Sequence, residues 1–179
     1  MTDPVRELKT RAGLLERRLR RGDPAALTRL RSLSEYRSLA APDLVPAASA
    51  VRRRQCLSII AIELGFSGWQ HASAVLTGAP GVADFGTLLY PRRCGGLLNL
   101  WYRNHDEAVR GHQAAGGYLL AYRRQCLVVD RLFIETMGLD PDAPEWRWMG
   151  YDWVRPRHVE ARTGLYGALI TQLPRELAA

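Results

Sequence analysis

Arginine pairs beside aromatic residues form one group of side chains in this sequence that could bind a small ligand. Tyr90 precedes one such pair closely and Tyr122 directly precedes the other. A guanidinium group can bind a carboxylate or phosphate through two parallel N–H donors. If both pairs lie in turns at one edge of a sheet, the sequence predicts an anion or small-molecule pocket. Its lining would be Tyr90, Arg92, Arg93, Trp101, Tyr122, Arg123 and Arg124.

A second group of arginines lies near the amino terminus. Residues 1–54 contain 13 basic and six acidic residues, whereas residues 55–179 contain twelve of each. The net charge of +7 therefore comes entirely from the first part of the chain. We expect this part to bind an anionic partner, either a nucleic acid or an acidic protein. The candidate residues are Arg17, Arg18, Arg20, Arg21, Arg52, Arg53 and Arg54. The alternative is an ordinary solvated helix face.

No pattern typical of catalysis or metal binding occurs in the sequence. It contains no Gly-rich phosphate loop, no Gly-x-Ser-x-Gly elbow and no His-Glu-x-x-His pair. His105 and His112 are two helical turns apart, about 10 Å, which is too far for both to bind one metal ion. The three cysteines, Cys56, Cys94 and Cys126, are expected to be reduced and buried. We therefore expect no metal, no cofactor and a non-catalytic function.

The elements that position the first arginine group are predicted to be helices within residues 1–78. Asp-Pro pairs at residues 3–4 and 23–24 predict two helix starts, because proline fits the first helical position. Apolar residues spaced by three and four predict helices over 4–21, 24–33, 48–64 and 67–76. A proline-bounded connection is expected over 42–46. Ser67 and Gln70 are expected to form a capping box for the last helix.

One stretch of this module resembles a known family. The segments 8–9 and 21–24, together with the run from Cys56 to Trp69 and its Gly-Phe-Ser-x-Trp turn, are similar to a small bacterial helical module. That module commonly precedes ankyrin repeats or other domains, and the resemblance covers residues 6–76. It implies a helical bundle and assigns no catalytic residue. No ankyrin signature follows here.

The helices on either side of Gly65 also have the layout of a helix-turn-helix motif. The second of them offers DNA the side chains of Gln70, His71, Ser73 and Thr77, but no arginine or lysine. Specific base and phosphate contacts usually involve those basic residues. The pattern therefore favours a packing corner over a DNA-reading helix.

Residues 79–179 are predicted to form an α+β domain that is rich in aromatic residues. Strands are expected over 85–90 and 97–102, joined as a hairpin, and over 118–122 and 125–129. Helices are expected over 104–115, 131–137 and 157–173. Eleven of the fifteen aromatic residues lie between Phe85 and Trp153. The stretch that contains Trp146, Trp148, Tyr151 and Trp153 is expected to be a loop pinned to the sheet, or alternatively the wall of a groove.

These patterns together predict an α+β protein. A four-helix module (1–78) precedes a small mixed or antiparallel sheet with helices on one face (79–179). The start of the chain lacks the pattern of a signal peptide, and no apolar run approaches the ~20 residues of a membrane span. We expect a cytoplasmic, non-catalytic binding or regulatory protein with an anionic partner. The alternative is a small-molecule-binding domain or enzyme that uses the pocket in the carboxy-terminal half.

Overall fold

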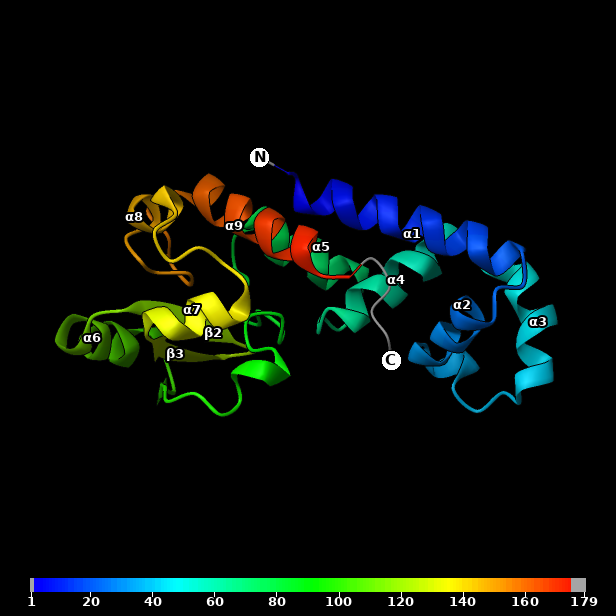
Figure 1. The fold of residues 1–179 in the computed structure, drawn as a ribbon, viewed down its shortest axis with the longest axis horizontal. Coiled ribbons are helices and arrows are strands. Elements are labelled where there is room, and N and C mark those ends of the chain that lie inside the picture. The colour runs from blue at the N-terminus through cyan, green and yellow to red at the C-terminus, as the bar shows by residue number, and fades with distance from the viewer. Residues whose placement is uncertain (1, 175–179) are drawn as a thin grey trace.

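A computed structural model describes residues 2–174, which form an elongated molecule with helices at one end and a small sheet at the other (Figure 1). Helix α1 (Pro4–Arg20) runs along the helical end. Helix α9 (Val159–Gln172), the last helix of the described chain, packs against α1 and reaches toward the sheet. The predicted α+β class is confirmed.

The first two helices begin where an aspartate satisfies free backbone N–H groups. Asp3 accepts hydrogen bonds from the backbone of Val5 and Arg6 at the start of α1. Asp23 accepts one from Ala26 at the start of α2 (Pro24–Arg29), so both predicted Asp-Pro starts are confirmed. Further along are two short 3-10 turns, η1 (Leu30–Ser32) and η2 (Ser34–Tyr36), and the helices α3 (Ala41–Ala50), α4 (Arg53–Glu63) and α5 (Trp69–Thr77).

Three local predictions for this half are wrong. The expected connection over 42–46 lies inside α3, where Pro42 occupies the first turn and needs no N–H partner. The helix predicted over 48–64 is therefore two helices, which separate at the extended residues Val51 and Arg52. The expected capping box also fails to form. Gly68 is the N-cap of α5, and the Oγ of Ser67 lies 3.0 Å from Nδ1 of His71 instead.

The sheet consists of three antiparallel strands in the order β1-β3-β2. These are β1 (Leu100–Tyr102), β2 (Tyr118–Tyr122) and β3 (Gln125–Val129), and β2 and β3 form the hairpin. The predicted strand over 85–90, and with it the predicted hairpin to 97–102, is wrong. This segment is irregular because Gly86 has a φ of +68° and its carbonyl accepts a hydrogen bond from the backbone of Arg123, in the β2–β3 turn.

Both faces of the sheet are covered. On one face, helix α6 (His105–Ala115) buries Ala108 against Leu119, Cys126 and Val128. Side chains of the other face, such as Leu127, join the main core together with Phe133 of helix α7 (Arg131–Met137). The tryptophan-rich stretch was expected to be a loop, but it contains helix α8 (Pro144–Met149), which Pro144 begins and Gly150 ends. Trp146 and Trp153 are fully buried.

A single hydrophobic core connects the two halves. Its buried side chains extend from Leu8 to Ile170, so residues 1–78 and 79–179 share it. Helix α9 contacts α1, α5 and α8. Arg11 of α1, which is only 3% exposed, fixes this contact by donating hydrogen bonds to the carbonyls of Ile170, Leu173 and Pro174 at 2.6, 3.0 and 3.1 Å. Within the described residues, no helix has the length and apolar character needed to cross a membrane.

Candidate functional site

The arginines at the end of α1 and at the start of α4 lie next to each other. Glu16 of α1 joins them, because its Oε1 accepts a hydrogen bond from Nη2 of Arg20 at 2.7 Å and its Oε2 accepts one from Nη1 of Arg53 at 3.1 Å. The structure thus brings together two runs that are distant in the sequence. We call the exposed members of both runs the arginine surface: Arg17, Arg20, Arg21, Arg52, Arg53 and Arg54. Arg18, the seventh predicted residue, is half-buried at the same end of α1.

Gly13 and Glu16, which the sequence did not single out, position Arg53. A Cβ atom at Gly13 would lie 2.6 Å from Nη1 of Arg53, so the glycine leaves the room in which this side chain crosses α1 to reach Glu16. A glycine inside a helix costs about 1 kcal/mol relative to alanine. The interior position of Gly13 was therefore the signal in the sequence that another group approaches closely.

The arginine surface has a surplus of positive charge. Among the described residues, Glu16 is the one carboxylate that pairs with it, and two arginines share that carboxylate. The exposed side chains of Arg17, Arg21, Arg52 and Arg54 form no ion pair within residues 2–174. An anion placed here would therefore meet guanidinium groups that are not already neutralised by the protein.

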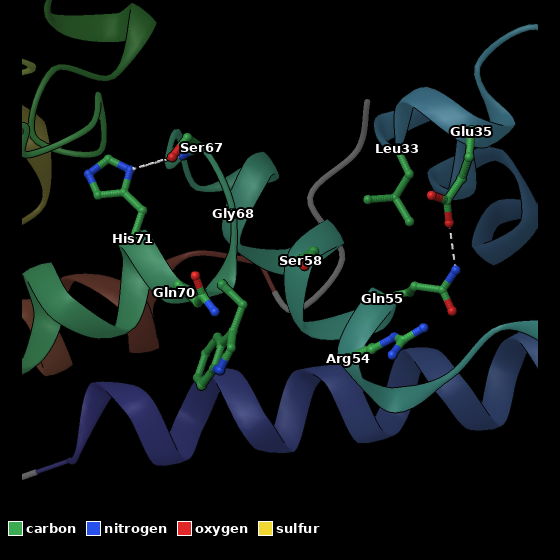
Figure 2. Close-up of a pocket in the computed structure, with 10 residues that line it drawn as sticks. Leu33, Glu35, Arg54, Gln55, Ser58, Ser67, Gly68, Gln70 and His71 are labelled. Carbon is green, nitrogen blue, oxygen red and sulfur yellow. Dashed lines mark hydrogen bonds between the residues drawn. The ribbon is translucent and has the colours of Figure 1, made fainter.

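A polar groove begins beside Arg54 (Figure 2). Its volume is about 580 Å³, and its walls come from Leu33 and η2, from α4, and from the start of α5 with the two residues before it. The lining residues are Leu33, Glu35, Arg54, Gln55, Ser58, Ser67, Gly68, Trp69, Gln70 and His71. Gln55 holds the walls together, because its Nε2 donates to Oε1 of Glu35 at 2.6 Å and its Oε1 accepts from the backbone of Arg52 at 2.8 Å.

His71 at the edge of this groove is a structural link. Its Nδ1 accepts the backbone N–H of Ser67 at 3.0 Å, which places the ring proton on Nε2. That Nε2 lies 2.8 Å from the carbonyl oxygen of Asp84 and donates to it. Both ring nitrogens are therefore used within the fold, as the packing-corner interpretation of this helix pair requires.

Three of the aromatic residues predicted to line a pocket form a cluster. The ring centres of Tyr90, Trp101 and Tyr122 lie 5.4 to 5.6 Å from one another, so each ring contacts the other two. The guanidinium carbon of Arg123 lies 5.9 Å from the ring centre of Tyr122. We call Tyr90, Trp101 and Tyr122 the aromatic cluster. Trp101 is its most accessible member, with 42% of its surface exposed.

The remaining residues of the predicted pocket do not converge in the same way. Arg93 donates hydrogen bonds to the carbonyls of Thr136 and Met137, both at 2.5 Å, and so binds the end of α7. Arg92 and Arg124 are exposed. Because the three rings contact one another, a ligand would have to lie on the aromatic cluster and not between its members.

The side chains of His105 and Asp130, which are of types that could do acid–base chemistry, are used to hold elements in place. Nε2 of His105 lies 2.6 Å from Oδ2 of Asp152, and Asp130 accepts the backbone N–H of Phe133 at the start of α7. Burial raises the pKa of Cys56 and of Cys126 to about 11, so both remain thiols at neutral pH. No group of three or more His, Cys, Asp or Glu side chains in the described part of the chain could hold a metal ion.

Comparison with protein-family models, with curated proteins and with solved structures found no match for this chain. The similarity of residues 6–76 to the bacterial helical module therefore stays a prediction.

Proposed function

We propose that this chain is a non-catalytic binding protein that holds a nucleic acid on its arginine surface. The observation that supports this best is the shared contact at Glu16, through which the arginine runs of α1 and α4 lie side by side. One carboxylate between two guanidiniums leaves an excess of positive charge. Phosphates bound there would neutralise this excess and release the counterions that surround nucleic acid.

The surroundings of the arginine surface favour a nucleic acid over an acidic protein. Protein partners are usually anchored by exposed apolar or aromatic side chains at the centre of the interface. In the described residues the exposed large apolar side chains lie outside α1 and α4; they are Val45, Leu98, Leu100, Trp101, Leu132, Trp148 and Tyr151. A phosphate backbone needs no such anchor, because charge and hydrogen bonds supply most of the affinity.

The groove beside Arg54 supports the same proposal. Ser58 and Gln70 place a hydroxyl and an amide group on its wall. Such neutral donors commonly contact the phosphate and sugar oxygens that position a protein on nucleic acid. We therefore propose that the backbone of the bound strand passes from the arginine surface toward this groove.

The test is the salt dependence of binding to a labelled 20-nucleotide oligomer, measured by fluorescence anisotropy between 50 and 200 mM salt, as both single strand and duplex. The variant Arg17→Gln/Arg52→Gln/Arg54→Gln removes three charges that form no ion pair in the described chain. Each lost phosphate contact reduces the slope of log K against log salt by about 1. We expect the slope to fall by about 2 to 3 and the affinity at 50 mM salt to fall at least tenfold.

The matched control is Arg110→Gln/Arg147→Gln/Arg157→Gln, which removes three exposed arginines from the other half of the protein. It should leave the slope almost unchanged. Binding that does not depend on salt, or an equal loss in both triple variants, would contradict the proposal. Tighter binding of polyglutamate than of either oligomer would identify an acidic protein as the partner and would also overturn it.

A further inference from the structure

A second surface lies at the sheet end of the molecule, far along its length from the arginine surface (Figure 1). It consists of the aromatic cluster and the neighbouring residues of β1 and the segment before it. Leu98 is 86% exposed, and Leu100 and Trp101 are 46% and 42% exposed. Trp101 lies on the side of the sheet that holds Tyr90 and Tyr122, whereas Leu100 pairs with Val128 and faces the side that α6 covers. An aromatic ring that is exposed to this extent beside two others indicates a surface that is covered in use.

This second surface is positively charged as well as apolar. Residues 85–104 and 116–129, which contain the aromatic cluster and the β2–β3 turn, include five arginines and no aspartate or glutamate. One of the five, Arg93, binds the end of α7. The other four are exposed and form no ion pair within residues 2–174; they are Arg92, Arg103, Arg123 and Arg124.

The ligand that fits must therefore have flat apolar rings and negative charge. Exposed aromatic rings bind such rings by stacking. The guanidinium carbon of Arg123 lies 5.9 Å from the ring centre of Tyr122, so a positive charge is present beside the aromatic cluster. Nucleic acid has both features, but its bases are free to stack on a protein only in a single strand. We propose that the aromatic cluster is a stacking platform for the bases of a single-stranded nucleic acid. Arg92, Arg123 and Arg124 would contact its phosphates.

Other occupants fit this surface less well. A second copy of the chain would bring the same unpaired arginines face to face, which costs free energy through like-charge repulsion. An acidic peptide could pair with the arginines, but it has no flat ring for Trp101 unless it contains aromatic residues. The platform deepens the proposed function, because it identifies single strands as the class of nucleic acid that is bound.

The experiment compares a labelled 15-nucleotide oligo-uridine with a duplex of equal length, again by fluorescence anisotropy on the full chain. The single strand should bind more tightly. Trp101→Ala should weaken its binding about 5- to 100-fold, because one stacked base accounts for that much affinity, whereas Trp101→Phe should retain most of it. Trp148→Ala is the matched control, since Trp148 lies on α8 and is 52% exposed. Circular dichroism and the thermal midpoint establish that each variant is folded.

A second variant keeps the test decisive if Trp101→Ala does not fold. Arg92→Gln/Arg124→Gln changes two exposed side chains without an ion pair in the described chain, and it should reduce the salt slope for oligo-uridine by about 2. Equal affinity for strand and duplex, or an equal loss in Trp148→Ala, would overturn the platform. So would tighter binding of polyglutamate, or a dimer in solution that Trp101→Ala dissociates without any binding of the oligomer.

The variants distinguish a failure of the proposed function from a failure of the stacking platform. If the triple variant of the arginine surface loses binding and the Trp101 and Arg92/Arg124 variants keep it, the platform is wrong and the proposed function remains. If only the Trp101 and Arg92/Arg124 variants lose binding, the platform is right and the role of the arginine surface is wrong. If all variants bind as the parent does, both proposals are wrong.

Discussion

At the scale of single residues, three polar side-chain atoms are buried where α9 packs against the loop that precedes it. Nε1 of Trp153, Nε of Arg162 and the hydroxyl of Tyr166 are buried without a hydrogen bond of good geometry to a described protein atom, although the indole N–H of Trp153 is close enough to the Tyr166 hydroxyl to lower its pKa slightly. The rings of Trp153 and Tyr166 meet edge to face at 4.9 Å. Each unsatisfied polar atom costs about 1–3 kcal/mol of stability. These residues therefore lower the stability of the core that they help to fill.

Because of Tyr166, we expect the free energy of unfolding to fall at alkaline pH. Burial raises the pKa of Tyr166 to about 12, whereas an unfolded tyrosine ionises near pH 10. Above pH 10 the unfolded chain loses this proton first. Stability that is fully present below pH 10 is therefore lost between pH 10 and 12, by roughly 3 kcal/mol. Tyr166→Phe should make this decline shallower and should leave stability at pH 7 unchanged or higher, as measured by urea unfolding from pH 7 to 12.

A control for this prediction is Tyr151→Phe, which removes an exposed hydroxyl. We expect it to change the free energy of unfolding at pH 7 by no more than about 0.5 kcal/mol. If Tyr166→Phe declines above pH 10 as steeply as the parent does, the buried phenol is not responsible for the loss.

At the scale of elements, the sequence predicted helix ends well wherever a local signal determines them. Asp3 and Asp23 each cap a helix at the predicted position, because capping involves side chains only two or three residues away. Prediction failed where prolines were taken as the bounds of a connection, as in α3, and where a tryptophan-rich stretch was expected to be a loop, as in α8. It failed again over 85–90, where the adjacent Leu88 and Leu89 are both buried in an irregular segment, a pattern that depends on distant contacts.

The turn between α4 and α5 gives an element-scale prediction. Gly65 and Gly22 both have positive φ, +87° and +69°. A Cβ atom at Gly65 would lie 2.0 Å from Oγ1 of Thr87, whereas one at Gly22 would have no atom within 4 Å. Gly22→Ala should cost about 1–2 kcal/mol of stability from backbone strain alone. Gly65→Ala should cost about 2–4 kcal/mol, because the overlap adds to similar strain.

Urea unfolding of the two alanine variants measures this difference directly. Equal losses in both would show that the turn tolerates a side chain against Thr87, and that its packing is looser than these distances imply.

At the scale of the whole molecule, the residues of the candidate sites were predicted from the sequence, but the way in which they contact one another was not. The charge imbalance identified the arginine surface, yet the Glu16 contact that joins its two runs depends on how α1 packs against α4. The aromatic cluster was likewise predicted from Tyr90, Trp101 and Tyr122. That these rings contact one another, while Arg93 turns to α7, follows from sheet order and from an irregular segment that the sequence did not predict.

The contact between α1 and α9 gives a prediction about the whole fold. Arg11→Met keeps most of the apolar volume but leaves the carbonyls of Ile170 and Leu173 without their donor. We expect a loss of about 2–4 kcal/mol in the free energy of unfolding, together with faster hydrogen exchange in α9. Arg6→Met, at an exposed position of the same helix, should change stability by no more than about 0.5 kcal/mol. Similar losses in the two variants would contradict a role for Arg11 in holding α9.

The position of α9 has a consequence for how the protein is made. During translation, α1 leaves the ribosome well before the helix that covers it, because some 140 residues separate the end of α1 from the start of α9. Until α9 emerges, Leu8 and Leu15 lack part of the surroundings that bury them in the finished protein. The nascent chain therefore exposes the apolar face of α1 for most of its synthesis. During this period a chaperone would find the largest apolar surface to bind.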